Sequence, residues 1–195
     1  CSKNKINPAT EPGCNPLNIP NFISLARLLS VPILVWAIVD SQMVLAFWLF
    51  VGAGISDAVD GFLARYLEAK SVLGAYLDPL ADKALLMGVF ITFGIEGYLP
   101  SWIVILVVFR DILIIGGAML YHTLTQSLQM TPLFVSKVNT ATQIILAGFV
   151  LALLALDVDY DMALTILIWL AALTTVLSGA VYVVRWTIQA SSLED

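Results

Sequence analysis

Residues 57–82 read DAVDGFLARYLEAKSVLGAYLDPLAD and place four aspartates in two otherwise apolar stretches. Asp57 and Asp60 are three residues apart, and Asp78 and Asp82 are four apart. Residues at these spacings lie on one face of a helix, so each pair is predicted to share a face. A carboxylate at the centre of a membrane helix costs about 2.5–3.5 kcal/mol, and acids in such a place are usually functional.

The whole chain has the composition of a membrane protein. Of its 195 residues, 60% are apolar and 12% are charged, and the mean hydropathy is +0.95. Soluble domains average about 45–50% apolar and about 25% charged residues, so the composition excludes a disordered protein, a disulfide scaffold and nearly every soluble class. A net charge of −5 without a basic stripe excludes a nucleic-acid binder. We expect an all-α membrane protein with about six to seven spans.

Six apolar stretches can be marked, and we expect each to form a transmembrane helix. They cover residues 21–39, 42–65, 73–95, 100–121, 138–156 and 162–185. Basic residues mark alternate ends of these stretches, and the positive-inside rule therefore places both termini and the loops at 66–72 and 122–137 in the cytoplasm. No repeat or linker divides the chain, so we expect one six-helix domain over residues 18–187, followed by a C-terminal tail at 188–195.

A polar tail at residues 1–17 precedes the domain. It contains both cysteines, Cys1 and Cys14, which allows a disulfide between them, and it lacks the apolar segment of a secretory signal. It also lacks an Arg-rich transit pattern. We therefore expect a bacterial inner membrane, with the mitochondrial inner membrane as the alternative.

The two aspartate pairs are expected to meet in space. The helices that carry them are antiparallel around a loop centred near residue 69, and Asp60 and Asp78 are each nine positions from that centre. Asp57 and Asp82 are twelve and thirteen positions away. At about 1.5 Å per residue, all four acids lie at similar depth, near the cytoplasmic end of the pair.

Four like charges in a low-dielectric site need either protonation or a bound divalent cation. An all-oxygen donor set fits Mg²⁺ or Mn²⁺, or else Ca²⁺. A partly protonated polar seam that only holds the helices together is the alternative. Gly61, Ala64 and Gly74 share the helical stripes of the acids. They leave room for a bulky group beside the ion, or else allow close helix packing.

The spacing also resembles the complete signature of the CDP-alcohol phosphatidyltransferase family. It reads Asp57-x2-Asp60-Gly61-x2-Ala64-Arg65-x8-Gly74-x3-Asp78-x3-Asp82. The resemblance implies a homodimer of six-helix chains with a site that faces the cytoplasm. There a metal-bound CDP-linked lipid transfers its phosphatidyl group to an alcohol and releases CMP.

The same resemblance implies a role for each motif residue. Asp57, Asp60 and Asp78 would hold metal, and Asp82 would add a ligand or act as the general base that takes the proton of the attacking hydroxyl. The nucleotide pocket would be lined by Gly61, Ala64, Arg65 and Gly74. Three residues of the first helix, Asn21, Ser24 and Arg27, would either reach the nucleotide or anchor that helix at the interface.

The rest of the chain resembles the eukaryotic-type cardiolipin synthases, in NIPNFISLAR, SDAVDGFLAR, LGAYLDPLADKALL, FRDILIIGGAML and FVSKVNTATQ. That implies CDP-diacylglycerol as donor, phosphatidylglycerol as acceptor, and cardiolipin and CMP as products. Phosphatidylglycerophosphate synthases share much of the pattern, so glycerol 3-phosphate is the alternative acceptor, although they more often carry Arg-Glu where this chain has Arg110-Asp111.

Arg110 and Lys137 are predicted to bind the acceptor phosphate near the metal. The alternatives are an ion pair inside the bundle for Arg110 and snorkelling to the lipid headgroups for Lys137. A cation-coupled transporter is a distant alternative for the whole chain. Such a protein would spread its charges over the membrane depth or repeat them in two halves, and this sequence does neither.

Overall fold

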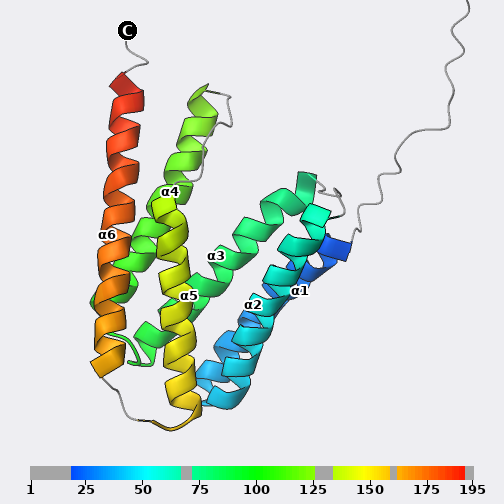
Figure 1. The fold of residues 1–195 in the computed structure, drawn as a ribbon. Coiled ribbons are helices and arrows are strands. Elements are labelled where there is room, and N and C mark those ends of the chain that lie inside the picture. The colour runs from blue at the N-terminus through cyan, green and yellow to red at the C-terminus, as the bar shows by residue number, and fades with distance from the viewer. Residues whose placement is uncertain (1–18, 67–71, 126–133, 159–161, 192–195) are drawn as a thin grey trace, which may run out of the picture.

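The structure is a computed structural model. It describes residues 19–66, 72–125, 134–158 and 162–191, with side chains described in 26–56, 82–117, 134–158 and 162–185. The helices are α1 (Ile19–Val39), α2 (Met43–Tyr66), α3 (Val72–Ile95), α4 (Ser101–Thr125), α5 (Phe134–Ala155) and α6 (Met162–Ser191) (Figure 1). Each one coincides with an apolar stretch of the sequence, and the described residues form no strand. The all-α prediction is therefore confirmed, whereas the predictions for Cys1 and Cys14 lie outside the described residues.

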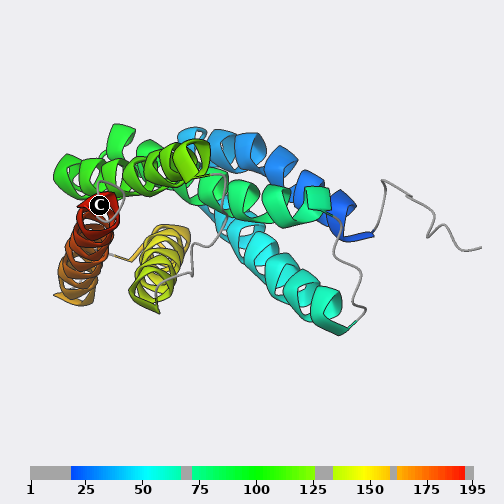
Figure 2. The ribbon, with the colours of Figure 1, turned by 90° about the horizontal axis from the view of Figure 1, so that it is seen from above.

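The third helix connects the two parts of the bundle. It contacts α1 on one side and α4 and α5 on the other, while α5 also packs on α2 and α6, and α4 on α6. Figures 1 and 2 show α3 running obliquely between the pair α1 and α2 and the group α4, α5 and α6. A side chain on α3 can therefore face either part of the molecule.

The core draws buried apolar side chains from all six helices, and many of them lie where α3 packs against α1 and α4. Its largest fully buried side chains include Leu34, Ile38, Phe90, Phe93 and Ile103. Gly88 lets the first and third helices approach closely, because a Cβ atom at this position would lie 3.2 Å from Cγ1 of Val31. The α1–α3 contact is thus a tight one, and two residues of the candidate site, Arg27 and Asp82, face each other across it.

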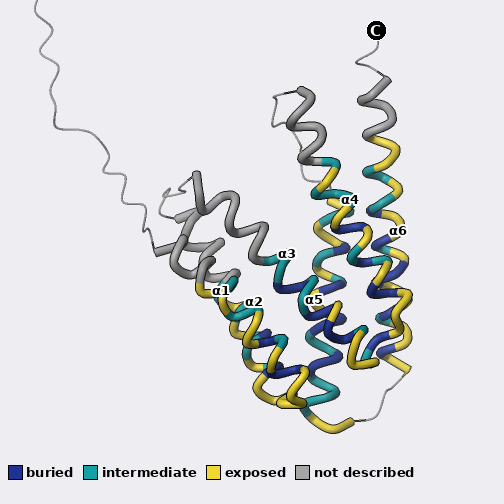
Figure 3. The backbone as a smooth tube through the Cα atoms, turned by 180° about the vertical axis from the view of Figure 1, so that it is seen from behind, coloured by how far each residue is buried: buried dark blue, intermediate teal, exposed yellow. Residues whose placement is uncertain are grey.

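Exposed residues run along the helices of the bundle, as Figure 3 shows, and many of them are large and apolar. Trp36, Trp48, Trp102 and Trp169 are among many large apolar side chains that are exposed. Soluble monomers rarely expose so much contiguous apolar surface, whereas a membrane-facing surface requires it.

In the part of the chain that the structure describes, two helical segments are long and apolar enough to cross a membrane. They are Phe134–Ala155 and Met162–Arg185. The apolar segments Ala26–Val39 and Met43–Ser56 are shorter. Six crossings and cytoplasmic termini therefore stay a prediction.

A residue with a left-handed backbone conformation follows each of three helices, α1, α3 and α5. Ser41 has φ 59°, Gly97 has φ 77° and Asp157 has φ 54°. At the end of α1, the backbone N–H of Gln42 donates to the carbonyl of Ala37 at 2.8 Å, and the same pattern recurs at the end of α5. These are Schellman caps, which satisfy the last carbonyls of a helix and reverse the chain within a few residues.

Candidate active site

The aspartate motif lies on two helices, as predicted. Asp57 and Asp60 are in α2, and Asp78 and Asp82 are in α3. The first helix packs against both. Among these acids, the structure describes the side chain of Asp82 alone, so the expected convergence of four carboxylates stays a prediction. The same holds for the side chains of the predicted nucleotide pocket, Gly61, Ala64, Arg65 and Gly74.

Asp82 forms an ion pair with Arg27 across the α1–α3 contact. Nη1 of Arg27 donates a hydrogen bond of 2.6 Å to Oδ1 of Asp82. The arginine side chain is only 3% exposed and the aspartate is 42% exposed. Arg27 therefore lies in the bundle beside the motif instead of at the surface, which favours the site role over interfacial anchoring.

A cavity of about 90 Å³ adjoins this ion pair. Its walls come from four helices and are formed by Arg27, Phe50, Ala53, Gly54, Asp82, Leu85, Leu86, Thr140 and Ile144. A Cβ atom added at Gly54 would meet nothing within 4 Å, so this wall is open. The lining thus combines the charged side chains of Arg27 and Asp82 with mainly apolar side chains.

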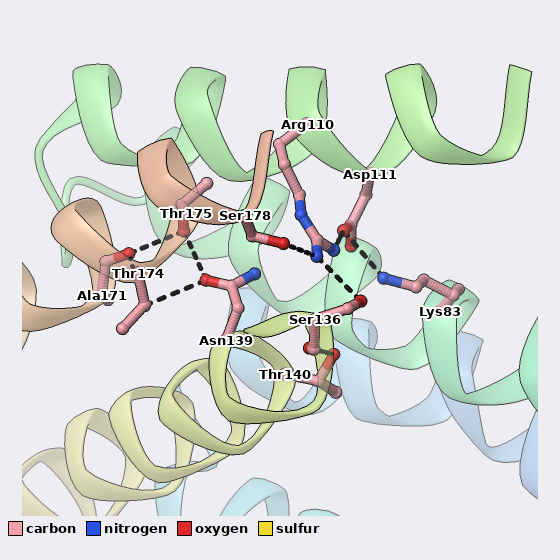
Figure 4. Close-up of polar contacts among 10 residues, drawn as sticks. All are labelled: Lys83, Arg110, Asp111, Ser136, Asn139, Thr140, Ala171, Thr174, Thr175 and Ser178. Carbon is pink, nitrogen blue, oxygen red and sulfur yellow. Dashed lines mark hydrogen bonds and ion pairs between the residues drawn. The ribbon is translucent and has the colours of Figure 1, made fainter. Parts of the chain in front are cut away.

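A second charged cluster follows directly in sequence. Nζ of Lys83 donates to Oδ1 of Asp111 at 2.7 Å, and Nη1 of Arg110 donates to the same oxygen at 2.7 Å (Figure 4). Nη2 of Arg110 donates to Oγ of Ser136 at 2.9 Å and also to Oγ of Ser178. The cluster thus joins α3, α4, α5 and α6.

These contacts bear on the predicted acceptor residues. Arg110 is 3% exposed and is engaged by protein partners, as in the ion-pair alternative. Lys137, the next residue after Ser136, is exposed on α5. No acceptor is bound, so acceptor binding by Arg110 and Lys137 stays a prediction.

Below the arginine, polar side chains continue along the α5–α6 contact (Figure 4). The side-chain oxygen of Asn139 accepts hydrogen bonds from Thr174 at 3.0 Å and from Thr175 at 2.8 Å. Gln143, one turn further along α5, is fully buried, and neither of its amide atoms has a hydrogen-bond partner among the described residues. An unsatisfied buried amide is unfavourable, so this position costs stability.

The sequence reasoning missed Lys83, Asp111, Asn139 and Gln143 as interior polar residues. A signal was available, because each lies inside an apolar stretch where charged and amide groups are rare. Lys83 also directly follows the last motif aspartate.

The predicted metal site is neither supported nor refuted by the described residues. No group of three or more acidic, histidine or cysteine side chains occurs among them, but the side chains of Asp57, Asp60 and Asp78 are not part of that set. The donor types fit a hard divalent cation, since every member is a carboxylate. The partly exposed Asp82 has surface left for a ligand beside its contact with Arg27.

Comparison with known proteins gives the family. The sequence model of the CDP-alcohol phosphatidyltransferase family matches residues 17–177 of this chain. The chain is 36% identical over 190 residues to CDP-diacylglycerol–glycerol-3-phosphate 3-phosphatidyltransferase 1, chloroplastic, of Oryza sativa subsp. japonica, covering 87% of this chain and 57% of that protein. It is 32% identical over 193 residues to cardiolipin synthase (CMP-forming) of Homo sapiens, covering 90% of this chain and 64% of that protein.

A shorter match links the chain to a bacterial protein. It is 37% identical over 103 residues to a putative cardiolipin synthase of Mycobacterium tuberculosis, covering 51% of this chain and 48% of that protein. The chain spans less than two thirds of the length of each of these relatives. The family match covers most of the chain and includes the whole aspartate motif, and the protein belongs to the CDP-alcohol phosphatidyltransferase family.

Proposed function

We propose that this protein transfers the phosphatidyl group of CDP-diacylglycerol to phosphatidylglycerol and so forms cardiolipin and CMP. The observation that carries the proposal is the Arg27–Asp82 pair, which places the last motif aspartate beside a cavity with charged and apolar walls. Relatives named cardiolipin synthase (CMP-forming) support cardiolipin and CMP as the products.

In the proposed reaction, the acceptor hydroxyl attacks the phosphorus of the phosphatidyl group. The new bond joins the acceptor oxygen to this phosphorus, the bond to CMP breaks, and CMP leaves with the electron pair. Asp82 takes the proton of the hydroxyl as general base. Its 42% exposure and its place at the cavity wall support this role, since a base must reach the acceptor.

Asp57, Asp60 and Asp78 would hold a divalent cation, Mg²⁺ or Mn²⁺, or else Ca²⁺, with Asp82 as a further ligand. Such an ion offsets the negative charge of a diphosphate and of a departing nucleotide. Gly61, Ala64 and Gly74 would leave space for the nucleotide beside the acids. Arg65 would pair with a phosphate through two parallel hydrogen bonds.

The proposed setting is a bilayer crossed by all six helices, with both termini and the active site on the cytoplasmic side. The basic residues at alternate ends of the apolar stretches support this orientation. We place the protein in a bacterial inner membrane, with the mitochondrial inner membrane as the alternative, and propose that it works as a homodimer.

The second candidate acceptor is glycerol 3-phosphate. The rice relative, whose name states that acceptor, is 36% identical to the chain and supports this alternative. The donor, the leaving group and the base would be the same, and the two acceptors differ in what surrounds the attacking hydroxyl.

An acceptor competition assay tests the proposal. Purified full-length protein is supplied with CDP-diacylglycerol, Mg²⁺ or Mn²⁺, and either phosphatidylglycerol or glycerol 3-phosphate, and CMP and lipid products are measured. We expect cardiolipin with phosphatidylglycerol. Phosphatidylglycerophosphate from glycerol 3-phosphate alone would refute the acceptor and keep the reaction class, while no CMP with either acceptor would refute the function. Glu96→Gln, at an exposed acid away from the site, is the control for loss of one carboxylate.

A further inference from the structure

Two consecutive residues of α3 make charged contacts with different neighbours. Oδ1 of Asp82 accepts from Arg27 on α1 at 2.6 Å, and Nζ of Lys83 donates to Asp111 on α4 at 2.7 Å. Consecutive residues of a helix point about 100° apart. The two contacts therefore hold α3 from two directions, and a rotation of α3 about its own axis would lengthen at least one of them.

The contact of Lys83 with α4 is made to a buried carboxylate that other residues also hold in place. Asp111 is 0% exposed, and its Oδ1 atom also accepts from Arg110. Arg110 in turn donates to Ser136 on α5 and Ser178 on α6. Lys83 is thus attached to three helices through one carboxylate oxygen, whereas Asp82 is the more exposed of the two α3 residues.

We propose that Lys83, Asp111 and Arg110 are positioning residues, which set the rotation of α3 and thereby the direction of the Asp82 carboxylate. The inference rests on the proposed function, in which Asp82 is the general base. In this proposal Arg110 acts by holding Asp111 in place, and it does not contact the acceptor directly. The 3% exposure of Arg110 supports that assignment, because a buried guanidinium has almost no surface left for a ligand.

Lys83→Met is the most informative variant. The substitution removes the cation that ties α3 to α4, while Asp111 keeps its hydrogen bond from Arg110, so the buried carboxylate stays paired and the protein is expected to fold. We expect kcat to fall about 10- to 100-fold, the usual range for loss of a residue that orients a site residue. KM for either substrate should stay within about twofold, because the binding contacts remain.

Lys83→Arg tests the cause, since arginine keeps the charge and can reach the same carboxylate. We expect it to restore kcat to within about threefold of the wild-type protein. Arg185→Met, at an exposed residue of α6, is the control for loss of one positive charge and should leave kcat unchanged.

Disulfide crosslinking measures the position of α3 without any reaction. In a chain with Cys1→Ser and Cys14→Ser, the pair Val31→Cys and Gly88→Cys places two thiols at the tight α1–α3 contact. We expect ready oxidation to a disulfide in this background, and loss of crosslinking when Lys83→Met is added but not when Lys83→Arg is added.

Three results would overturn the proposal. Unchanged kcat in Lys83→Met would make the cluster purely structural. A raised acceptor KM with normal kcat would make Lys83 a contact of the acceptor. Crosslinking that survives in Lys83→Met while kcat falls would show that α3 does not rotate. If the wild-type protein releases no CMP, the proposed function fails, and the crosslinking result still decides whether Lys83 holds α3.

Discussion

Arg27 of α1 and Asp82 of α3 are joined by a hydrogen bond of 2.6 Å between Nη1 and Oδ1. The arginine is the buried partner and the aspartate is the accessible one. A buried guanidinium needs a counter-charge, because an ion in a low-dielectric interior is strongly unfavourable without one. The proposed base therefore has a second task, which is to balance a charge within the bundle.

This asymmetry predicts different costs for the two single substitutions. Asp82→Asn should lower the free energy of unfolding by about 3–5 kcal/mol, because the buried guanidinium of Arg27 loses its ion pair with this carboxylate. Arg27→Met should cost only about 1–3 kcal/mol, because the remaining carboxylate is partly exposed. Thermal unfolding of the purified variants in detergent measures both.

The double variant Arg27→Met with Asp82→Asn is the control for this prediction. It removes both charges, so it should be more stable than Asp82→Asn alone. Equal losses from the two single variants, or strictly additive losses in the double variant, would contradict the assignment of Asp82 as a counter-charge of Arg27. In the reaction, Asp82→Asn should abolish CMP release while CDP-diacylglycerol still binds.

For Gln143 we predict that substitution raises the stability of the protein instead of lowering it. Its amide is fully buried, and neither of its polar atoms has a partner among the described residues. Gln143→Met keeps the length of the side chain and removes the unsatisfied atoms, so we expect about 1–3 kcal/mol of added stability. Asn139→Leu is the matched comparison, and it should lose stability because Thr174 and Thr175 lose their shared acceptor. A destabilised Gln143→Met would mean that this amide binds a ligand or internal water.

Much of the fold could be predicted from the sequence. The long apolar stretches located the six helices of the described residues, because apolar runs of about 20 residues are typical of helices in a membrane protein. Lipid-facing and core-facing residues are both apolar, however, so the sequence did not indicate which face of each helix packs inward. The central place of α3, between α1 and α4, therefore came from the structure.

The partners of the charged residues were harder to predict. Regular spacing predicts that Asp78 and Asp82 share a face, because that relationship is local to one helix. The pairing of Asp82 with Arg27 depends on how two helices pack, and no local spacing encodes it. Lys83 escaped notice because its partner, Asp111, is 28 positions away in another helix.

Metal dependence is the prediction that follows from the aspartate spacing. Asp57→Asn should raise the Mg²⁺ or Mn²⁺ concentration needed for half-maximal CMP release, because one anionic ligand is lost. Chelation of divalent ions should stop the reaction of the wild-type protein, and added Mg²⁺ should restore it. Full activity after exhaustive chelation would refute the metal site and leave the aspartates as a polar seam.

Ser41 offers a test of the turn between α1 and α2. Its φ of 59° is unfavourable for a residue with a Cβ atom, and its side chain is exposed. Ser41→Gly removes that strain and should stabilise the protein by about 0.5–1 kcal/mol, after the greater entropy of glycine in the unfolded chain is offset. Ser41→Ala is the control, since alanine keeps the Cβ atom and should give no gain. A rise in the melting temperature with both substitutions, or with neither, would contradict the left-handed cap at the end of α1.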